Sequence, residues 1–156
     1  MMLKDKKMEI RPAKIEDVPF CAALEMQCFS EPWSENSLRN AVMDSDTYFF
    51  VVVSENKLVG YFVAGNICDE INLYTIAVSP DVRGQGFGDA LIAKLKDIAA
   101  QYNAIFIGLE VRPSNTNAVK LYERHGFLQT GRRPSFYRKP TEDALLYTLD
   151  FREENV

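Results

Sequence analysis

The stretch that decides the fold reads Ile76-Ala77-Val78-Ser79-Pro80-Asp81-Val82-Arg83-Gly84-Gln85-Gly86-Phe87-Gly88-Asp89. It predicts a strand, a glycine-rich loop and the start of a helix. Pro80 ends the apolar run because it cannot extend a strand ladder, and the alternate glycines permit backbone angles that a β-carbon forbids. Beyond the loop, apolar side chains recur at helical spacing, at Leu91, Leu95, Ile98 and Tyr102.

This glycine loop is expected to bind a phosphate group. A loop at the start of a helix presents unpaired N–H groups, which favour an anion together with the helix dipole. The loop lacks the Gly-x-Gly-x-x-Gly spacing of dinucleotide-binding folds and the Gly-Lys-Ser/Thr ending of a P-loop. A tight turn from strand to helix would also need glycines for steric reasons alone, so both interpretations stay open at this point.

Composition limits the classes of function. A chain of 156 residues is large enough for a sizeable core, and we expect residues 1–156 to form a single domain. The net charge of −4 and the pI near 5.1 argue against a general nucleic-acid binder and leave room for a cationic substrate. The sequence contains no apolar run as long as a membrane span, and its polar start lacks a secretory signal, which predicts a cytoplasmic protein.

Cysteine and histidine content argues against a metal centre. The spacing of Cys21, Cys28 and Cys68 matches no metal site, and the odd number is typical of reduced thiols. His125 is the only histidine, so a cysteine nucleophile would have one candidate base. We therefore expect neither a bound metal nor a catalytic cysteine.

Hydrophobic periodicity predicts an α/β fold with a mixed sheet of about seven strands covered by about four helices. Strands are expected over residues 8–11, 48–53, 58–64, 71–78, 104–111, 127–132 and 145–151, and helices over 15–29, 35–43, 88–102 and 115–125. The order strand, helix, strand over residues 71–111 predicts a parallel pair. The strand at 104–111 is apolar enough to be buried on both faces, and a polar, proline-bearing loop should join the last two strands.

Glu110 is the first candidate for chemistry. It interrupts an apolar run near the carboxyl end of a strand, beside the edge at which α/β sheets bind ligands. Partial removal from water there would make the carboxylate a stronger base, so Glu110 is a candidate general base. A glutamate at a strand end also serves as an ion-pair partner of a lysine or of Arg112, and the residues alone leave both roles open.

Three further side chains suit a binding site. Asn115 is placed to cap a helix, and Tyr122 lies two turns further along it, so both can project to one side. A phenol can donate a proton or a hydrogen bond, although a helix tyrosine is more often a packing residue. Trp33, the single tryptophan, lies in a turn and either packs between two helices or lines a groove.

Several segments resemble one family. The segment Arg83-Gly84-Gln85-Gly86-Phe87-Gly88 resembles the Arg/Gln-x-x-Gly-x-Gly/Ala motif of the GCN5-related N-acetyltransferases (GNAT), in which this loop holds the pyrophosphate of acetyl-coenzyme A. Residues 109–115 and 121–127 resemble the second half of the bacterial ribosomal-protein-alanine N-acetyltransferases, a subgroup of that family. Residues 29–34 and 69–78 resemble its substrate-side turn and its central strand, so the similarity covers nearly the whole chain.

The resemblance implies the GNAT acyl-CoA N-acyltransferase fold and direct transfer from acetyl-CoA to an amine in a ternary complex. Glu110 would be the base and Tyr122 the acid, while Trp33 and Tyr137 would contact the acceptor. Cofactor contacts are implied for Ile76, Ala77, Val78, Arg83, Gly84, Gln85, Gly86, Phe87, Gly88, Asp89 and Asn115. Asp89 departs from relatives that often carry a basic residue there, and its carboxylate would repel a phosphate.

The expected function is therefore acetyl-CoA-dependent acetylation of a protein N-terminal amine, that of a ribosomal protein with N-terminal alanine. No direct nucleic-acid or membrane partner is expected. Alternatives are the same chemistry on a lysine side chain, a polyamine or an antibiotic, and a non-catalytic acyl-CoA sensor. The basic stretch from Arg132 to Lys139 is interpreted either as a substrate contact or as a solvated loop.

Overall fold

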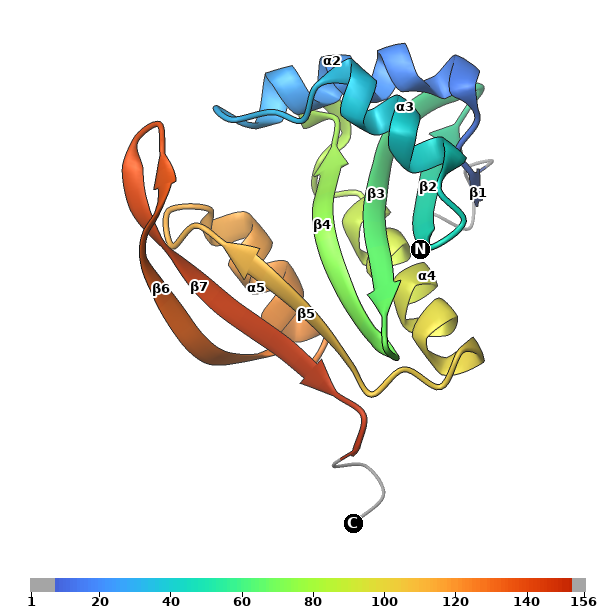
Figure 1. The fold of residues 1–156 in the computed structure, drawn as a ribbon. Coiled ribbons are helices and arrows are strands. Elements are labelled where there is room, and N and C mark those ends of the chain that lie inside the picture. Colours follow the sequence, from blue (N-terminus) through green and yellow to red (C-terminus); the bar gives the residue numbers. More distant parts are fainter. Residues whose placement is uncertain (1–7, 153–156) are drawn as a thin grey trace.

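A computed structural model describes residues 8–152, which form seven strands, four α-helices and two short 3-10 helices (Figure 1). The strands are β1 (Met8–Pro12), β2 (Thr47–Ser54), β3 (Lys57–Ile67), β4 (Glu70–Val78), β5 (Phe106–Val111), β6 (Leu128–Arg138) and β7 (Thr141–Asp150). The helices are η1 (Ile15–Asp17), α2 (Val18–Cys28), α3 (Glu35–Met43), η2 (Pro80–Val82), α4 (Phe87–Gln101) and α5 (Thr116–Arg124). The predicted strand and helix numbers are confirmed.

The strands form one mixed sheet in the order β1-β2-β3-β4-β5-β7-β6. Neighbours pair antiparallel, except that β4 and β5 run parallel and are connected through α4. A parallel pair needs a crossover connection, which the long amphipathic helix after the glycine loop supplies. The predicted strand-helix-strand unit is therefore confirmed.

Helices cover both faces of the sheet (Figure 1). On one face, α2 and α3 bury Val18, Cys21 and Leu38 against β2 and β3. On the other face, α4 and α5 pack on a larger apolar cluster whose fully buried helix residues include Leu91, Ile92 and Leu95. Leu91 and Leu95 are one helical turn apart, which explains why the predicted periodicity placed them on the buried side.

Two side-chain caps fix the starts of α3 and α5. The Ser34 Oγ accepts a hydrogen bond of 3.0 Å from the Ser37 N–H at the start of α3. The Asn115 Oδ1 accepts one of 3.3 Å from the Ala118 N–H at the start of α5, as predicted. Such caps satisfy N–H groups that have no acceptor within the helix.

The sheet opens between β4 and β5. Pairing between them covers only Glu70–Leu73 against 106–109, and the register of β4 against β3 then skips Tyr74. A bulge of this kind increases the local twist and redirects side chains. Beyond it β4 and β5 diverge into a V-shaped opening, visible in Figure 1. The backbone edge of β4 that faces β5 is therefore available to a ligand.

Two sequence expectations about the carboxyl-terminal half are wrong. β5 is not buried on both faces: Ile107, Leu109 and Val111 are buried, whereas Glu110 between them is exposed. The expected loop before β7 is mostly strand, because β6 continues to Arg138, with register shifts between Gln129 and Gly131 and between Arg133 and Tyr137. β6 is an edge strand, where Pro134 removes no ladder bond that a further strand would need.

Candidate active site

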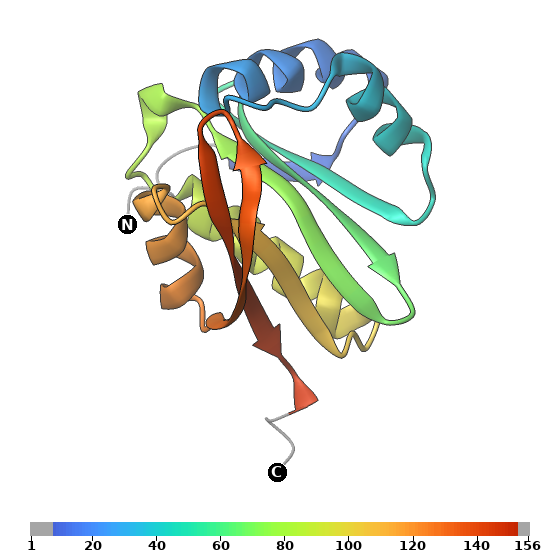
Figure 2. The ribbon, with the colours of Figure 1, turned by 60° about the vertical axis from the view of Figure 1, so that its left-hand side comes forward.

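A cleft of about 1460 Å³ occupies the opening between β4 and β5. Its walls come from the connection between α2 and α3, from β4, the glycine loop, α5, β5 and the β6–β7 hairpin. Ligand pockets commonly measure about 300–1,000 Å³, so this cleft has room for two ligands at once. Figure 2 shows the tip of the β6–β7 hairpin reaching toward the α2–α3 connection, which bounds the cleft on that side.

The glycine loop has the geometry of an anion cradle. Gly84 and Gly86 have φ angles of +81° and +91°, which side chains with a β-carbon rarely adopt. Gly86 is the N-cap of α4, and its carbonyl accepts from Ala90 N–H at 3.0 Å. The first-turn N–H groups of Phe87 and Gly88 therefore lack intrahelical acceptors and border the cleft. Such N–H groups at the start of a helix are suited to hold an anion.

The structure brings most of the predicted cofactor residues together. Those that line the cleft are Ile76, Ala77, Val78, Arg83, Gly84, Gly86, Phe87, Gly88, Asp89 and Asn115. Gln85 is separate from them and lines a smaller depression beside β2 and β3. Arg83 folds back on the protein, donating from Nε to the Val78 carbonyl at 3.3 Å and from Nη2 to the Cys28 Sγ at 3.3 Å.

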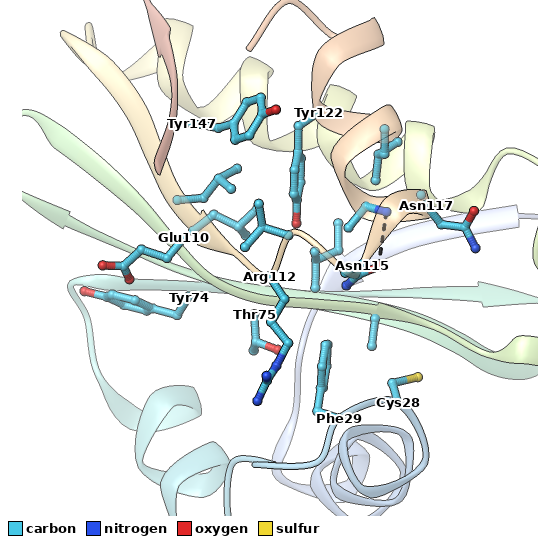
Figure 3. Close-up of a pocket in the computed structure, with 18 of the residues that line it drawn as sticks. Cys28, Phe29, Tyr74, Thr75, Glu110, Arg112, Asn115, Asn117, Tyr122 and Tyr147 are labelled. Atoms are coloured by element: carbon cyan, nitrogen blue, oxygen red, sulfur yellow. Dashed lines mark hydrogen bonds between the residues drawn. The ribbon is translucent and has the colours of Figure 1, made fainter. Parts of the chain in front are cut away.

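Glu110 lies on the β5 wall of the cleft, where Figure 3 shows its carboxylate beside the Tyr74 ring. Its side chain is 36% exposed, so the carboxylate is removed from water only in part. It forms an ion pair with Arg133 of β6, with 3.0 Å between Nε and Oε2, rather than with Arg112. Water can therefore reach this carboxylate, and its counter-charge is an exposed guanidinium.

Tyr122 lines the same cleft as Glu110 but is buried. Its residue is 5% exposed, its ring packs against Phe127, and its hydroxyl points into the pocket in Figure 3. Burial raises the pKa of the Tyr122 phenol, and the nearby Tyr137 adds to the effect. The hydroxyl therefore keeps its proton at neutral pH and can act as a donor within the cleft.

Aromatic side chains line the other half of the cleft. The ring centroids of Trp33 and Tyr74 lie 6.0 Å apart, and Tyr137 stacks under the guanidinium of Arg112 with 4.4 Å between the Arg112 Cζ and the ring centroid. Burial raises the pKa of Tyr137 to about 12, with a further contribution from Glu110. The predicted residues Trp33 and Tyr137 thus both border the cleft.

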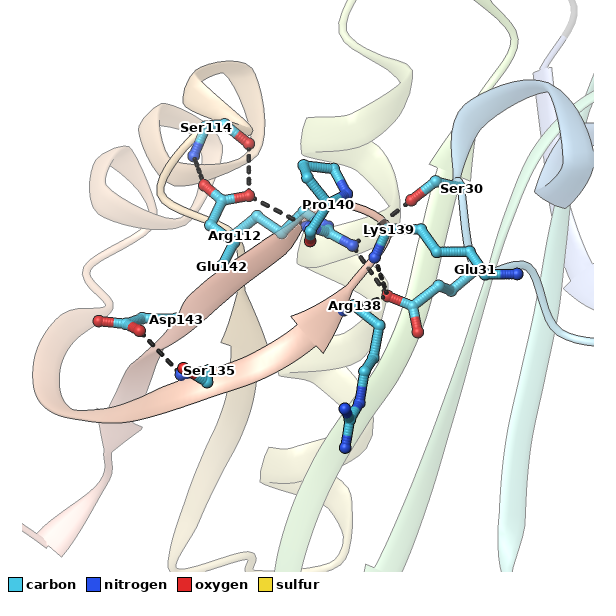
Figure 4. Close-up of polar contacts among 10 residues, drawn as sticks. All are labelled: Ser30, Glu31, Arg112, Ser114, Ser135, Arg138, Lys139, Pro140, Glu142 and Asp143. Carbon is cyan, nitrogen blue, oxygen red and sulfur yellow. Dashed lines mark hydrogen bonds and ion pairs between the residues drawn. The ribbon is translucent and has the colours of Figure 1, made fainter.

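Arg112 joins the α2–α3 connection to the β6–β7 hairpin across the aromatic half of the cleft (Figure 4). The sequence did not predict these contacts. The Arg112 Nη2 donates to Glu31 Oε1 at 2.9 Å, on the α2–α3 connection. Its Nη1 donates to Glu142 Oε1 at 3.1 Å and to the Pro140 carbonyl at 2.8 Å, on the hairpin. The Glu31 carboxylate also accepts from the Arg138 N–H at 2.9 Å. The sequence pointed to Arg112 only as an alternative ion-pair partner of Glu110, directly after β5.

A buried carboxylate supports the wall below Trp33. Glu25 of α2 is 1% exposed and accepts hydrogen bonds from the hydroxyls of Tyr61 and Thr75 and from the Trp33 N–H, the last at 2.8 Å. Burial raises the pKa of Tyr61, so that this hydroxyl stays protonated and donates. Glu25 therefore joins α2, two strands and the turn that carries Trp33.

Residues 8–152 lack two features that mark other classes of function. No group of three or more His, Cys, Asp or Glu side chains in this range could hold a metal ion. No helix in the same range is long and apolar enough to cross a membrane. Among the charged side chains that line the cleft, Arg112 forms an ion pair with Glu31, and Arg133 forms one with Glu110.

Comparison with known proteins relates this cleft to a family. The acetyltransferase (GNAT) family matches residues 18–127. Ribosomal protein bS18-alanine N-acetyltransferase of Escherichia coli K12 is 33% identical over 138 residues, which cover 85% of this chain and 90% of the relative.

Solved structures agree with that match. The crystal structure of the ribosomal-protein-S18-alanine N-acetyltransferase from Escherichia coli superposes with a TM-score of 0.85 at 29% identity, covering 92% of this chain and 94% of the other. Arabidopsis thaliana NAA60 in complex with acetyl-CoA has the same fold, with a TM-score of 0.86 at 19% identity and coverage of 94% and 99%.

Proposed function

This chain belongs to the GNAT family of N-acetyltransferases, and we propose that it transfers an acetyl group from acetyl-CoA to the N-terminal amine of a protein. The observation that carries the proposal is the opening between β4 and β5, with a glycine cradle at one end and Glu110 and Tyr122 on its walls. We further propose that residues 1–156 act as one domain. The proposed location is the cytoplasm, which contains the ribosomal proteins that would serve as acceptors.

Backbone groups of this chain would hold the donor. The first-turn N–H groups of α4 fit the pyrophosphate, and the β4 edge from Ile76 to Val78 fits the amide-bearing pantetheine arm. Acetyl-CoA supplies a thioester whose carbonyl carbon accepts the amine. The Asn115 Oδ1 caps α5, so its Nδ2 amide is the group of that side chain that would donate to the donor molecule.

Glu110 would act as the general base. The acceptor arrives as an ammonium ion and must lose a proton before its nitrogen can attack. The ammonium would replace the Arg133 guanidinium as the counter-charge, an exchange that costs little because both side chains of this ion pair are more than a third exposed. The carboxylate would then accept the proton directly or through water.

Tyr122 would serve the departing sulfur. As the new C–N bond forms, the C–S bond breaks and the sulfur leaves with its electron pair. The Tyr122 hydroxyl carries its proton at neutral pH and would donate a hydrogen bond, and then the proton, to this thiolate. Most of the rate acceleration would come from holding the two reactants in position between β4 and β5.

The proposed acceptor is an N-terminal alanine of a ribosomal protein. The Escherichia coli relative and the solved structure both carry names that state this activity for bS18 or S18. The aromatic half of the cleft, with Trp33, Tyr74 and Tyr137, supplies apolar surface for the first residues of a peptide.

Mass spectrometry of short peptides tests the proposal. One peptide begins with a free alanine, and a second has a blocked N-terminus and an internal lysine; each is incubated with the protein and acetyl-CoA. We expect acetylation of the free terminus only, and its loss in Glu110→Gln. Modification of lysine alone, or of neither peptide, would refute the proposed acceptor class.

A further inference from the structure

Asp89 places a negative charge where the proposed function needs to bind phosphates. It lies in the first turn of α4, directly after the glycine loop, and it lines the cleft. A bare carboxylate at this point would repel the pyrophosphate electrostatically and so oppose the attraction that the helix dipole provides. Its neighbours in the fold therefore decide what this residue does.

The carboxylate of Asp89 is bound by two side chains from the end of α5. Arg124 donates to it in a two-pronged geometry, from Nε to Oδ1 at 2.9 Å and from Nη2 to Oδ2 at 3.1 Å. The His125 Nε2 lies 2.7 Å from Oδ1. The Arg124 hydrogen bond holds the pKa of the Asp89 carboxyl below its ordinary value. Both carboxylate oxygens are thus engaged from the α5 side.

This contact fixes a guanidinium beside the glycine loop. A guanidinium has five N–H donors, of which Asp89 uses two, so three point elsewhere. The Arg124 side chain is 55% exposed and lines the cleft. Lys120, one helical turn earlier on α5, lines the same cleft. Asp89, Arg124 and Lys120 together carry a net charge of +1 in the cleft that the first-turn N–H groups of α4 also border.

We propose that Arg124, anchored by Asp89, binds a phosphate of the coenzyme, and that Asp89 is a positioning residue rather than a repulsive defect. The basic side chain that position 89 lacks is then supplied by α5. The inference rests on the proposed use of acetyl-CoA in this cleft, but it concerns binding alone and needs no acceptor.

Calorimetric titration of coenzyme A without acceptor tests the inference. Arg124→Gln should raise the Kd about tenfold, the usual effect of one charge-assisted hydrogen bond. Arg39→Gln is the matched control, because it removes an exposed arginine of another ion pair, on α3 and outside the cleft. Thermal unfolding of both variants verifies that they are folded.

A second titration uses 3′-dephospho-coenzyme A, which lacks one phosphate. If Arg124→Gln binds both ligands more weakly, Arg124 contacts the pyrophosphate. If it binds only coenzyme A more weakly, Arg124 contacts the 3′-phosphate; either result supports the inference. An Arg124→Gln Kd equal to that of Arg39→Gln for both ligands would overturn it. Because no acceptor is present, that failure would be distinct from a failure of the peptide assay.

The role of Asp89 has its own signature. If Asp89 anchors the guanidinium, Asp89→Asn should weaken coenzyme A binding about threefold while Arg124 is present, and should strengthen it in the Arg124→Gln background, where only repulsion is left. Tighter binding from Asp89→Asn in both backgrounds would show that the carboxylate only repels the phosphate, and would overturn the positioning role.

Discussion

Replacement of Glu25 by glutamine tests how the acceptor wall is held. One carboxylate oxygen, Oε2, accepts from the hydroxyls of Tyr61 and Thr75, and the other, Oε1, accepts from the Trp33 N–H. Glutamine has the same shape but only one acceptor oxygen. If that oxygen faces the hydroxyls, the amide NH₂ meets the Trp33 N–H, and two donors oppose each other; if it faces Trp33, the hydroxyls lose their acceptor.

The expected loss of stability follows from the number of hydrogen bonds that glutamine cannot make. At least one hydrogen bond to a charged acceptor is lost at a residue that is 1% exposed, and such a bond contributes about 1.5–3 kcal/mol. We therefore expect Glu25→Gln to lower the free energy of unfolding by about 2 kcal/mol. In a marginally stable domain, this is a large share of the total.

Urea denaturation followed by circular dichroism measures this difference, with the slope of the transition compared between variants to show that the denatured state is unchanged. Glu35→Gln is the control, because Glu35 is half-exposed in an (i, i+4) pair with Arg39 and should change stability by less than about 0.5 kcal/mol. Equal stability of Glu25→Gln and Glu35→Gln would refute the assigned role of Glu25.

Three further changes have expected outcomes. Arg112→Lys removes the forked contacts to both sides of the aromatic half, and should raise the KM for the peptide about tenfold while changing the Kd for acetyl-CoA less than twofold; equal effects on both would contradict this. Tyr122→Phe should keep the unfolding free energy and lower kcat at least tenfold, and unchanged kcat would exclude the phenol from the reaction. Asp17→Asn should cost about 1–2 kcal/mol at pH 7, because Arg11 holds the pKa of the Asp17 carboxyl below its ordinary 3.8. Because the folded-state pKa is lowered, the ionised Asp17 carboxylate stabilises the fold above its ordinary pKa, and this stabilisation is lost as the pH falls through the folded-state pKa. Urea denaturation should therefore show the free energies of unfolding of the wild-type chain and of Asp17→Asn converging in acid. A constant difference would contradict the linkage.

Local sequence signals predicted much of the fold. Ser34 and Asn115 carry their own capping oxygens, so α3 and α5 begin where the sequence predicted. The glycine loop and the apolar spacing of α4 depend on neighbouring residues only, and they predicted the parallel pair β4 and β5. Glu110 was placed correctly near the end of a strand beside the cleft.

The contacts that complete the site could not be predicted in this way. Arg112 meets side chains 30 and 81 positions away, and no local pattern encodes such a distance. Glu25 has no local sequence signal of its role, because its three donors come from β3, β4 and the turn at Trp33. The pairing of Glu110 with Arg133 depended on β6 being a strand, whereas its proline and charges predicted a loop.

The most direct test of the central claim compares turnover and donor binding in Glu110→Gln, with Glu35→Gln as the control. The rate of peptide acetylation and the Kd for acetyl-CoA are measured on the same preparations. If Glu110 removes the proton from the acceptor amine, kcat should fall at least about 100-fold while the Kd changes less than about twofold. An unchanged kcat, or parallel losses of turnover and donor binding, would contradict its assignment as the base.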